Sequence, residues 1–362
     1  MTRAADSHAP NNFDFVRLVA AAWVIVGHGY HLNGLYDTTP LLFNTAISTF
    51  AVRVFFVVSG YLVVASWRRD PHVGRFLARR ALRIWPGLCG VVLIAAFVLG
   101  PVMTTLDVAT YFSDPQTYGY LGTIFFYIQY YLPGVFAANV YPVAVNGSLW
   151  SLPAEVAMYL SVPAVALMGM ALPFRYAYAL GAKAVVAVAA IVPFVGSQPP
   201  VPVIVWATDL IEILWMAPYF VVGGCLDLFR RYVPLHLGAA AVLVVIGEAI
   251  SAAGPSVQIL LVLITCYAVI SFGTSSTPYI RRAARFGDLS YGIFLYGYPI
   301  QQIIAGAWHA DLPVPFQIAL ALVLAAACAF LSWRFIERPS LNLKPRTPRS
   351  APSSATTAGR SD

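Results

Sequence analysis

The sequence has few charged residues. Of 362 residues, 10% are charged and 59% are hydrophobic, whereas a soluble globular protein carries roughly 25% charged residues. This shortage excludes an ordinary soluble domain. It also argues against nucleic-acid binding despite the net charge of +7, because the arginines and lysines fall in short clusters between apolar runs and form no aromatic-interleaved basic face.

Three further features are missing. The four cysteines lie in apolar segments without C-x-x-C spacing or neighbouring ligands, so we expect buried thiols and neither a metal site nor a disulfide. The polar start MTRAADSHAPNNFD leads directly into a full-length apolar segment, so we expect an uncleaved anchor and no signal peptide. No internal repeat is visible, which disfavours a transporter built from inverted repeats.

Long apolar runs dominate the remainder. Each is long enough to cross a bilayer core of ~30 Å as a helix. We therefore predict an all-α, polytopic membrane protein with about ten transmembrane helices. The predicted spans are 15–36, 43–67, 81–100, 148–170, 177–196, 203–228, 236–252, 257–275, 288–309 and 314–336.

The basic clusters predict the orientation. If the N-terminus is cytoplasmic, each cluster falls on the cytoplasmic side, apart from Arg53 inside the second span, and the C-terminus is cytoplasmic too. We expect one membrane domain over 1–340 and a disordered cytoplasmic tail over 341–362, which is rich in Pro, Ser, Thr and Ala.

The outer side has one long link, about 101–147, that is rich in Tyr, Phe, Gly and Pro. Its middle, Gly119 to Phe136, is a candidate short interfacial helix. Its aromatic side chains are explained best as a membrane-surface belt; a platform for a carbohydrate ring is the alternative.

Arg17 and His28 stand out in the first span, FVRLVAAAWVIVGHGYHLNG, whereas its other histidine, His31, lies nearer the outer surface and is interpreted as structural. Arg17 and His28 are eleven residues apart, so they share a helix face but lie about 16 Å apart along the axis. Such residues mark functional sites by default. One face thus offers an anion anchor near the cytoplasm and a proton acceptor deeper in the membrane. Snorkelling of Arg17 and a helix-to-helix hydrogen bond of His28 explain the same residues equally well.

Arg80 and Arg83, in RFLARRALRIWP, lie three residues apart and share a helix face at the cytoplasmic rim. Guanidinium groups bind phosphates through paired donors, so these two arginines are candidates for the phosphates of a nucleotide-bearing donor. The alternative is that they only set membrane topology. Because both enter the helix, we favour a binding role.

Two carboxylates complete the candidate set. Glu155 lies in an apolar run two turns after Ser148, which we expect to cap the helix, and it needs a partner such as Arg53 or His28. Glu337 closes the last span in WRFIERPS and could pair with Arg80, with Arg83 or with its own loop.

Together these stretches resemble the acyltransferase 3 family of bacterial integral-membrane O-acyltransferases. The similar stretches are NNFDFVRLVAAAWVIVGH, VRVFFVVSGYL, RFLARRALRIWP, NGSLWSLPAEVAMYL, FGDLSYGIFLYGYPIQQ and ERP, and they follow the family order from about 11 to 340. One departure is that Gly297 occupies the position where many members carry a histidine before proline.

The resemblance implies a multi-pass enzyme of the bacterial inner membrane. It would move an acyl group, usually acetyl, from cytoplasmic acyl-CoA to a hydroxyl of a cell-envelope or exported carbohydrate. By position, His28 matches the catalytic histidine, Arg17 its paired arginine, Arg80 and Arg83 the pair linked to acyl-CoA, and Glu337 the late acid. Glu155 is our additional catalytic candidate. A small secondary metabolite as acceptor, or a non-enzymatic transporter of polyprenyl-linked glycans, are the alternatives. No metal or nucleic acid is expected; the partners are acyl-CoA, the acceptor and the bilayer.

Overall fold

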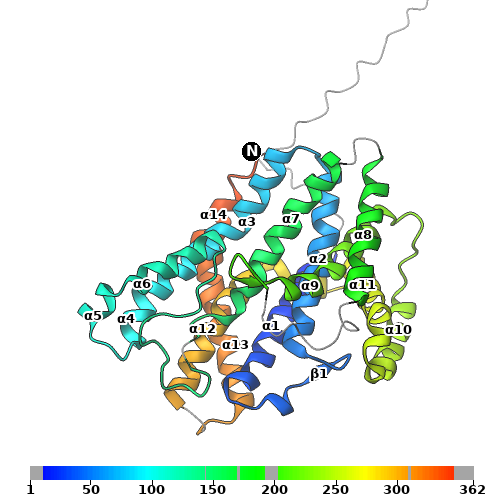
Figure 1. Ribbon diagram of the computed structural model, residues 1–362. Helices are drawn as coiled ribbons and strands as arrows, with labels where there is room; N and C mark the ends of the chain where they lie inside the picture. Colours follow the sequence, from blue (N-terminus) through cyan, green and yellow to red (C-terminus); the bar gives the residue numbers. More distant parts are fainter. Residues whose placement is uncertain (1–10, 143, 169–171, 192–202, 309–310, 346–362) are drawn as a thin grey trace, which may run out of the picture.

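The computed structural model describes residues 11–345 except 143, 169–171, 192–202 and 309–310. The described chain is a helical bundle with two very short hairpins (Figure 1). Its long helices are α1 (Phe13–Leu32), α2 (Ile47–Arg69), α3 (Val73–Ile94), α7 (Ser151–Met168), α8 (Phe174–Ile191), α9 (Leu210–Leu228), α10 (Leu237–Ile250), α11 (Gln258–Thr274), α12 (Ser290–Trp308) and α13 (Val314–Ser332).

Every predicted span overlaps one of these helices, which confirms the all-α prediction. Seven stretches of the described residues are long and apolar enough to cross a membrane, and one of them, Leu237–Thr274, contains both α10 and α11. Neither α8 nor α12 is among the seven. In α12 the reason is polarity, because it buries Gln301 and Gln302 between its neighbours. The count of ten crossings and the cytoplasmic termini stay predictions.

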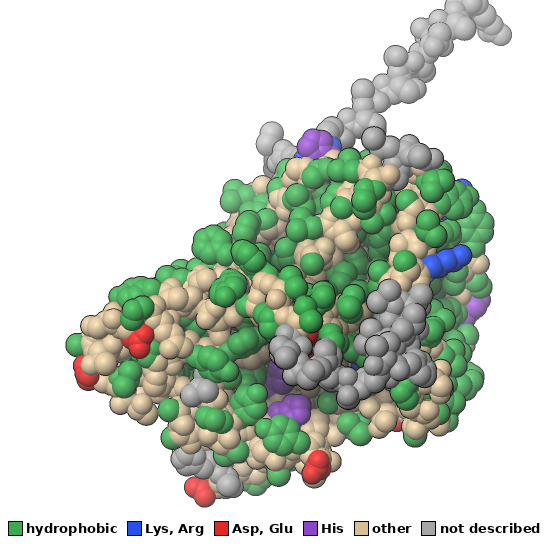
Figure 2. Space-filling model, in the orientation of Figure 1, with side chains coloured by type: hydrophobic (Ala, Val, Ile, Leu, Met, Phe, Trp, Pro, Cys, Tyr) green, Lys and Arg blue, Asp and Glu red, His purple; other side chains and the backbone are tan. Residues whose placement is uncertain are grey.

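Hydrophobic side chains cover most of the face drawn in Figure 2. On that face the clearest Lys and Arg side chains lie in the upper half, mainly at the right edge, and the Asp and Glu side chains lie on the lower half and the left tip. This separation is the pattern of a membrane protein that follows the positive-inside rule.

Helix α1 is the centre of the bundle. It packs against α2 and α11 on one side and against α12 and α13 on the other. Its small residues permit close approach: a methyl at Gly27 would overlap Ser48 of α2, and one at Gly29 would overlap Ile318 of α13. Arg17 and His28 of α1 therefore face neighbouring helices. Helices α8, α10 and α11 form the edge drawn at the right of Figure 1.

Helices α2 and α9 begin in the same way and cross tightly. Each follows a two-residue hairpin, β1–β2 (Leu41–Leu42, Thr45–Ala46) and β3–β4 (Ile204–Val205, Thr208–Asp209). In both turns the two central residues have positive φ, at Phe43 and Asn44 and at Trp206 and Ala207, which is the type I′ geometry.

The crossing itself is reciprocal. A methyl at Gly60 would overlap the carbonyl oxygen of Phe220, and a methyl at Gly223 would overlap that of Val57. Phe220 follows Val57 in the sequence by the same number of residues as Gly223 follows Gly60, and the second hairpin follows the first by that number too. The structure thus contains a local two-fold relation that the sequence did not reveal.

We expect Gly60→Ala to destabilise the protein. The added methyl meets backbone, which cannot rotate away, so overpacking should cost about 1–3 kcal/mol of the free energy of unfolding. Thermal unfolding of the detergent-solubilised chain measures the loss. Gly238→Ala is the matched control, because a methyl there has nothing within 4 Å; equal midpoints for the two variants would contradict the tight crossing.

Two expectations about local structure need correction. The short helices of the outer link are α5 (Val108–Ser113), α6 (Pro115–Gly119) and a 3-10 turn to Phe125, so the predicted helix from Gly119 to Phe136 is wrong for most of its length. The cap before α7 is Asn146, whose side chain accepts from the Ser148 N–H, and not Ser148.

At the C-terminal end, a π-helical turn, Trp333–Glu337, leads from α13 into α14 (Arg338–Leu341). Helix α14 packs against α3 (Figure 1). Residues 341–345 continue from it with hydrogen bonds typical of turns. The remainder of the predicted disordered tail lies outside the described residues, so the domain division stays a prediction.

Candidate active site

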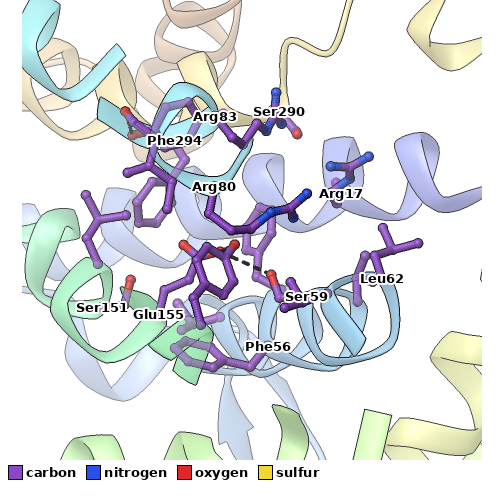
Figure 3. A pocket seen from close by; sticks show the side chains of 18 residues that line it. Arg17, Phe56, Ser59, Leu62, Arg80, Arg83, Ser151, Glu155, Ser290 and Phe294 are labelled. Atoms are coloured by element: carbon purple, nitrogen blue, oxygen red, sulfur yellow. Dashed lines mark hydrogen bonds between the residues drawn. The ribbon is translucent and has the colours of Figure 1, made fainter. Parts of the chain in front are cut away.

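A cavity of about 100 Å³ lies among α1, α2, α3, α7 and α12. Four charged side chains line it, three arginines and one carboxylate: Arg17, Arg80, Arg83 and Glu155 (Figure 3). Most of its remaining wall is apolar, with hydroxyl groups from Ser59, Ser151, Tyr159, Ser290 and Tyr291. Four of the six candidate residues predicted from the sequence thus meet at one cavity.

The arginines of helix α3 face different surroundings. The His72 side chain accepts a hydrogen bond from the Arg75 N–H and starts the helix at the cytoplasmic end of the predicted span. Outside the cavity, Asp70 pairs with Arg75 at 2.5 Å and with Arg79 at 2.7 Å. Hydrogen bonds from these two guanidinium groups hold the pKa of Asp70 well below its usual range. Arg79 is therefore tied to Asp70, and Arg80 and Arg83 face the cavity.

Asp288 is a site residue that the sequence reasoning missed. Its carboxylate accepts from Arg83 Nη2 at 2.6 Å and lies 3.1 Å from Arg17 Nη1. Through these two contacts Asp288 holds α1 and α3 together across the start of α12. An acid immediately before an apolar run, as in FGDLSYG, was the available signal.

Glu155 has partners other than those expected. Its Oε1 accepts from Ser59 Oγ at 3.1 Å and from the Tyr159 hydroxyl, and neither Arg53 nor His28 contacts it in the described structure. The Arg80 guanidinium lies 5.8 Å from the centroid of the Tyr159 ring. Tyr159 follows Glu155 by one helical turn, so the i, i+4 spacing could have identified this pair.

Arg80 differs from its neighbours in its ion pairing. Arg17, Arg79 and Arg83 each pair with a carboxylate, whereas within the described part of the chain Arg80 pairs with none. Its buried Nε, like those of Arg17 and Arg79, has no acceptor there. Leaving a buried charged donor unsatisfied is costly. Arg80 is therefore the cavity cation with the most free capacity to bind an anion.

His28 lies deeper along α1 and does not line this cavity. Its half-buried ring meets the edge of Tyr298 at 5.2 Å between centroids and 78°. Among the described residues nothing bonds to its Nδ1. On α12 the cavity wall comes close to His28. Phe294 lines the cavity and packs edge to face against Phe55, and Tyr298 follows Phe294 by one turn, about 6 Å along the helix.

Glu337 also lies outside the cavity. Its side chain is 2% exposed and accepts from Ser332 Oγ at 2.9 Å. It lies close enough to Arg83 for mutual attraction, although neither Arg80 nor Arg83 forms an ion pair with it in the described structure. Within the described residues there is no group of three His, Cys, Asp or Glu side chains that could hold a metal.

Comparison with known proteins identifies the family of the chain. The acyltransferase 3 family model, described as an acyltransferase domain, matches residues 11–334. An O-acetyl transferase of Shigella phage Sf6 is 27% identical over 91% of this chain and 96% of its own length. Nodulation protein 10 of Rhizobium leguminosarum bv. viciae is 28% identical over 92% of this chain and 94% of its own length. No solved structure matches the chain significantly. The chain belongs to the acyltransferase 3 family and is a membrane acyltransferase of the O-acetyltransferase type.

Proposed function

We propose that this enzyme transfers an acyl group, acetyl by preference, from cytoplasmic acyl-CoA to a hydroxyl of a cell-envelope or exported carbohydrate in the bacterial inner membrane. The observation that carries the proposal is the convergence of Arg17, Arg80 and Arg83 on one cavity, on the helix face that leads to His28. An arginine-lined, mostly apolar cavity suits a donor with phosphates at one end and an uncharged arm at the other.

The donor phosphates bind at the arginines. Arg80 supplies the hydrogen-bonding capacity that no described acceptor uses. Arg17 and Arg83 are held in place beforehand by Asp288, so little side-chain entropy is lost when an anion arrives. Glu155 fixes Tyr159 under Arg80, and Glu337 adds negative charge near Arg83; both act as positioning residues on the donor side.

The chemistry takes place at His28. A neutral imidazole accepts the proton of the acceptor hydroxyl while the hydroxyl oxygen attacks the thioester carbonyl carbon. The carbon–sulfur bond breaks, the ester forms, and the proton passes to the departing thiolate of CoA. In the alternative order the imidazole is acylated first and the acceptor then attacks the acyl-imidazole, which would carry the acyl group between a cytoplasmic donor and an outer acceptor.

The Phe55–Phe294 pair separates the cavity from His28 by about one helical turn. The arm of the donor has to pass this pair to bring the thioester to the imidazole. Beyond this pair, Ile25 of α1 packs directly on Gly297 of α12, so the passage requires these residues to move apart as well as the two phenyl rings to rotate.

The relatives support acetyl as the acyl group, since one is an O-acetyl transferase. A small secondary metabolite remains the second candidate acceptor. The test is radiolabelled acetyl-CoA with the purified chain in lipid nanodiscs, with and without bacterial envelope glycans. Label should enter the glycan fraction only with the protein. Label confined to small extractable molecules would favour the metabolite as acceptor. If the chain neither bound acetyl-CoA nor transferred label, the proposed donor would be wrong.

Lys344 gives the donor site a predicted pH dependence. Burial, and then repulsion from Arg80, Arg83 and Arg79, lowers the pKa of its ammonium group to about 8. The group is charged below this pKa and loses its charge as pH rises through it. We therefore expect the KM for acetyl-CoA to rise about two- to fivefold between roughly pH 7 and pH 9. Lys344→Arg, which stays charged, should flatten this rise, and Lys344→Met should start high at pH 7. Parallel profiles for all three proteins would contradict the assignment.

A further inference from the structure

A buried glutamine fixes the outer link onto α12. Gln302 is 0% exposed. Its Nε2 donates to the carbonyl oxygens of Tyr141 at 3.0 Å and Ala144 at 2.8 Å, and its Oε1 accepts from Asn139 Nδ2 at 2.8 Å. A buried side chain with all these groups satisfied specifies one conformation of the segment it binds.

The same segment is attached a second time, two turns earlier on α12. Asn146 Nδ2 donates to the carbonyl oxygen of Leu295 at 2.8 Å. At the next residue, a methyl on Gly147 would overlap the ring of Tyr298. The stretch from Asn139 to Gly147 is therefore held against α12 at both ends by polar contacts.

This stretch brings tyrosines close to Tyr298, the residue whose ring contacts that of His28. Tyr141 belongs to it, and Tyr131 is paired with it through an antiparallel bridge to Ala144. Ala144, the bridge partner of Tyr131, packs with Tyr298. The carbonyl oxygen of Tyr141 accepts from Gln302, one turn after Tyr298, and the Tyr36 ring lies 5.0 Å from that of His31, one turn beyond His28. Tyr131, Tyr141 and Tyr36 are 49%, 39% and 52% exposed, whereas Tyr298 is 6% exposed and packs edge-on with the His28 ring.

A membrane-surface belt does not explain this arrangement. Belt tyrosines lie at helix ends facing lipid, whereas these converge on a buried tyrosine beside a histidine. Their flat apolar faces and hydroxyl groups together match a sugar ring, which has C–H faces and hydroxyl edges. None of the side chains named here is a Lys or Arg, and the arginines of the donor cavity lie on the far side of the Phe55–Phe294 pair, so the site is suited to a neutral ring and not to a phosphate.

We infer that Tyr36, Tyr131 and Tyr141 form the acceptor subsite, which binds a neutral pyranose ring above Tyr298 and presents its hydroxyl to His28. This inference rests on the proposed function and names its acceptor site. Figure 2 shows histidine side chains at the surface of a hollow in the lower half of that face, so imidazole groups on this side of the molecule are reachable from solvent. Gln302 acts as the positioning residue of the subsite.

Saturation-transfer NMR without any acyl donor tests the subsite. The probes are methyl α-D-glucopyranoside and methyl α-L-rhamnopyranoside, with 1-hexanol as the non-sugar hydroxyl, added to the full chain in nanodiscs. We expect saturation of the glycoside ring protons by the wild-type chain. Tyr141→Ala and Tyr131→Ala should weaken binding roughly tenfold, and the corresponding Phe variants should retain it because the ring face remains.

Tyr232→Ala is the matched control, since that tyrosine is 71% exposed at the opposite, arginine-rich end and should bind as the wild type does. Gln302→Leu should lower saturation in the same way as Tyr141→Ala. Saturation of hexanol but of neither glycoside, or equal glycoside signals in all variants, would overturn the inference. Because no acyl donor is present, failure of the acyl-CoA proposal would leave these results unchanged, and the two failures are distinguishable.

Discussion

Arg80→Ala is expected to weaken acetyl-CoA binding by roughly ten- to a hundredfold. A hydrogen bond between a guanidinium and a phosphate contributes about 1.5–3 kcal/mol, and each 1.4 kcal/mol corresponds to a tenfold change in affinity. Arg80 is chosen because it forms no ion pair in the described structure. Its removal therefore leaves no carboxylate stranded, and the folded chain should remain intact.

Equilibrium binding of acetyl-CoA to the nanodisc-embedded chain measures this effect directly. Arg80→Lys should recover part of the affinity, because an ammonium keeps the charge but lacks the paired donors. Arg231→Ala is the control, because Arg231 is exposed and lies outside the cavity. If Arg80→Ala bound acetyl-CoA as tightly as the wild type, the donor phosphates would have to lie elsewhere.

Removal of His28 should have the largest effect on turnover. General-base catalysis contributes typically a factor of 10²–10⁴, so His28→Ala should lose about that factor in kcat. Its affinity for acetyl-CoA should stay close to that of the wild type, because His28 does not line the donor cavity. Product formation measured over hours, beside binding of the same donor, separates the two quantities.

His31→Ala is the matched control. His31 lies one turn farther out on the same helix, and its ring lies 5.0 Å from that of Tyr36. It should retain most turnover. Full transfer by a correctly inserted His28→Ala variant would remove His28 from the reaction. Mass spectrometry of the wild-type chain after acid quench distinguishes the two reaction orders, since only the relay deposits an acyl group on the peptide that contains His28.

The helix positions could be predicted because apolar runs of this length have few alternatives to helix in a membrane. Hydropathy reports how much of a segment faces lipid, however, and not which polar groups meet. Asp288 illustrates the limit: in the sequence it is an ordinary acid at a helix start, and only the packing of α1, α3 and α12 brings it to Arg17 and Arg83.

The candidate site was predictable to a similar degree. Helical spacing placed Arg80 and Arg83 on one face, and the structure puts both on the cavity wall with Arg17. It does not bring His28 or Glu337 to the same wall. The distance between Arg17 and His28 along α1 followed from helix geometry, but the barrier between them, Phe55 on Phe294, joins helices far apart in sequence and leaves no local pattern.

The glycine crossing of α2 and α9 has a consequence for the donor cavity. In the described structure no residue of α9 lines this cavity, yet Gly60 touches α9, and its neighbour Ser59 lines the wall and bonds to Glu155. The contact of α2 with α9 thus fixes the position of Ser59 and of the carboxylate that it holds. Helix α9 therefore shapes a binding site from behind, through a helix that lies between the two.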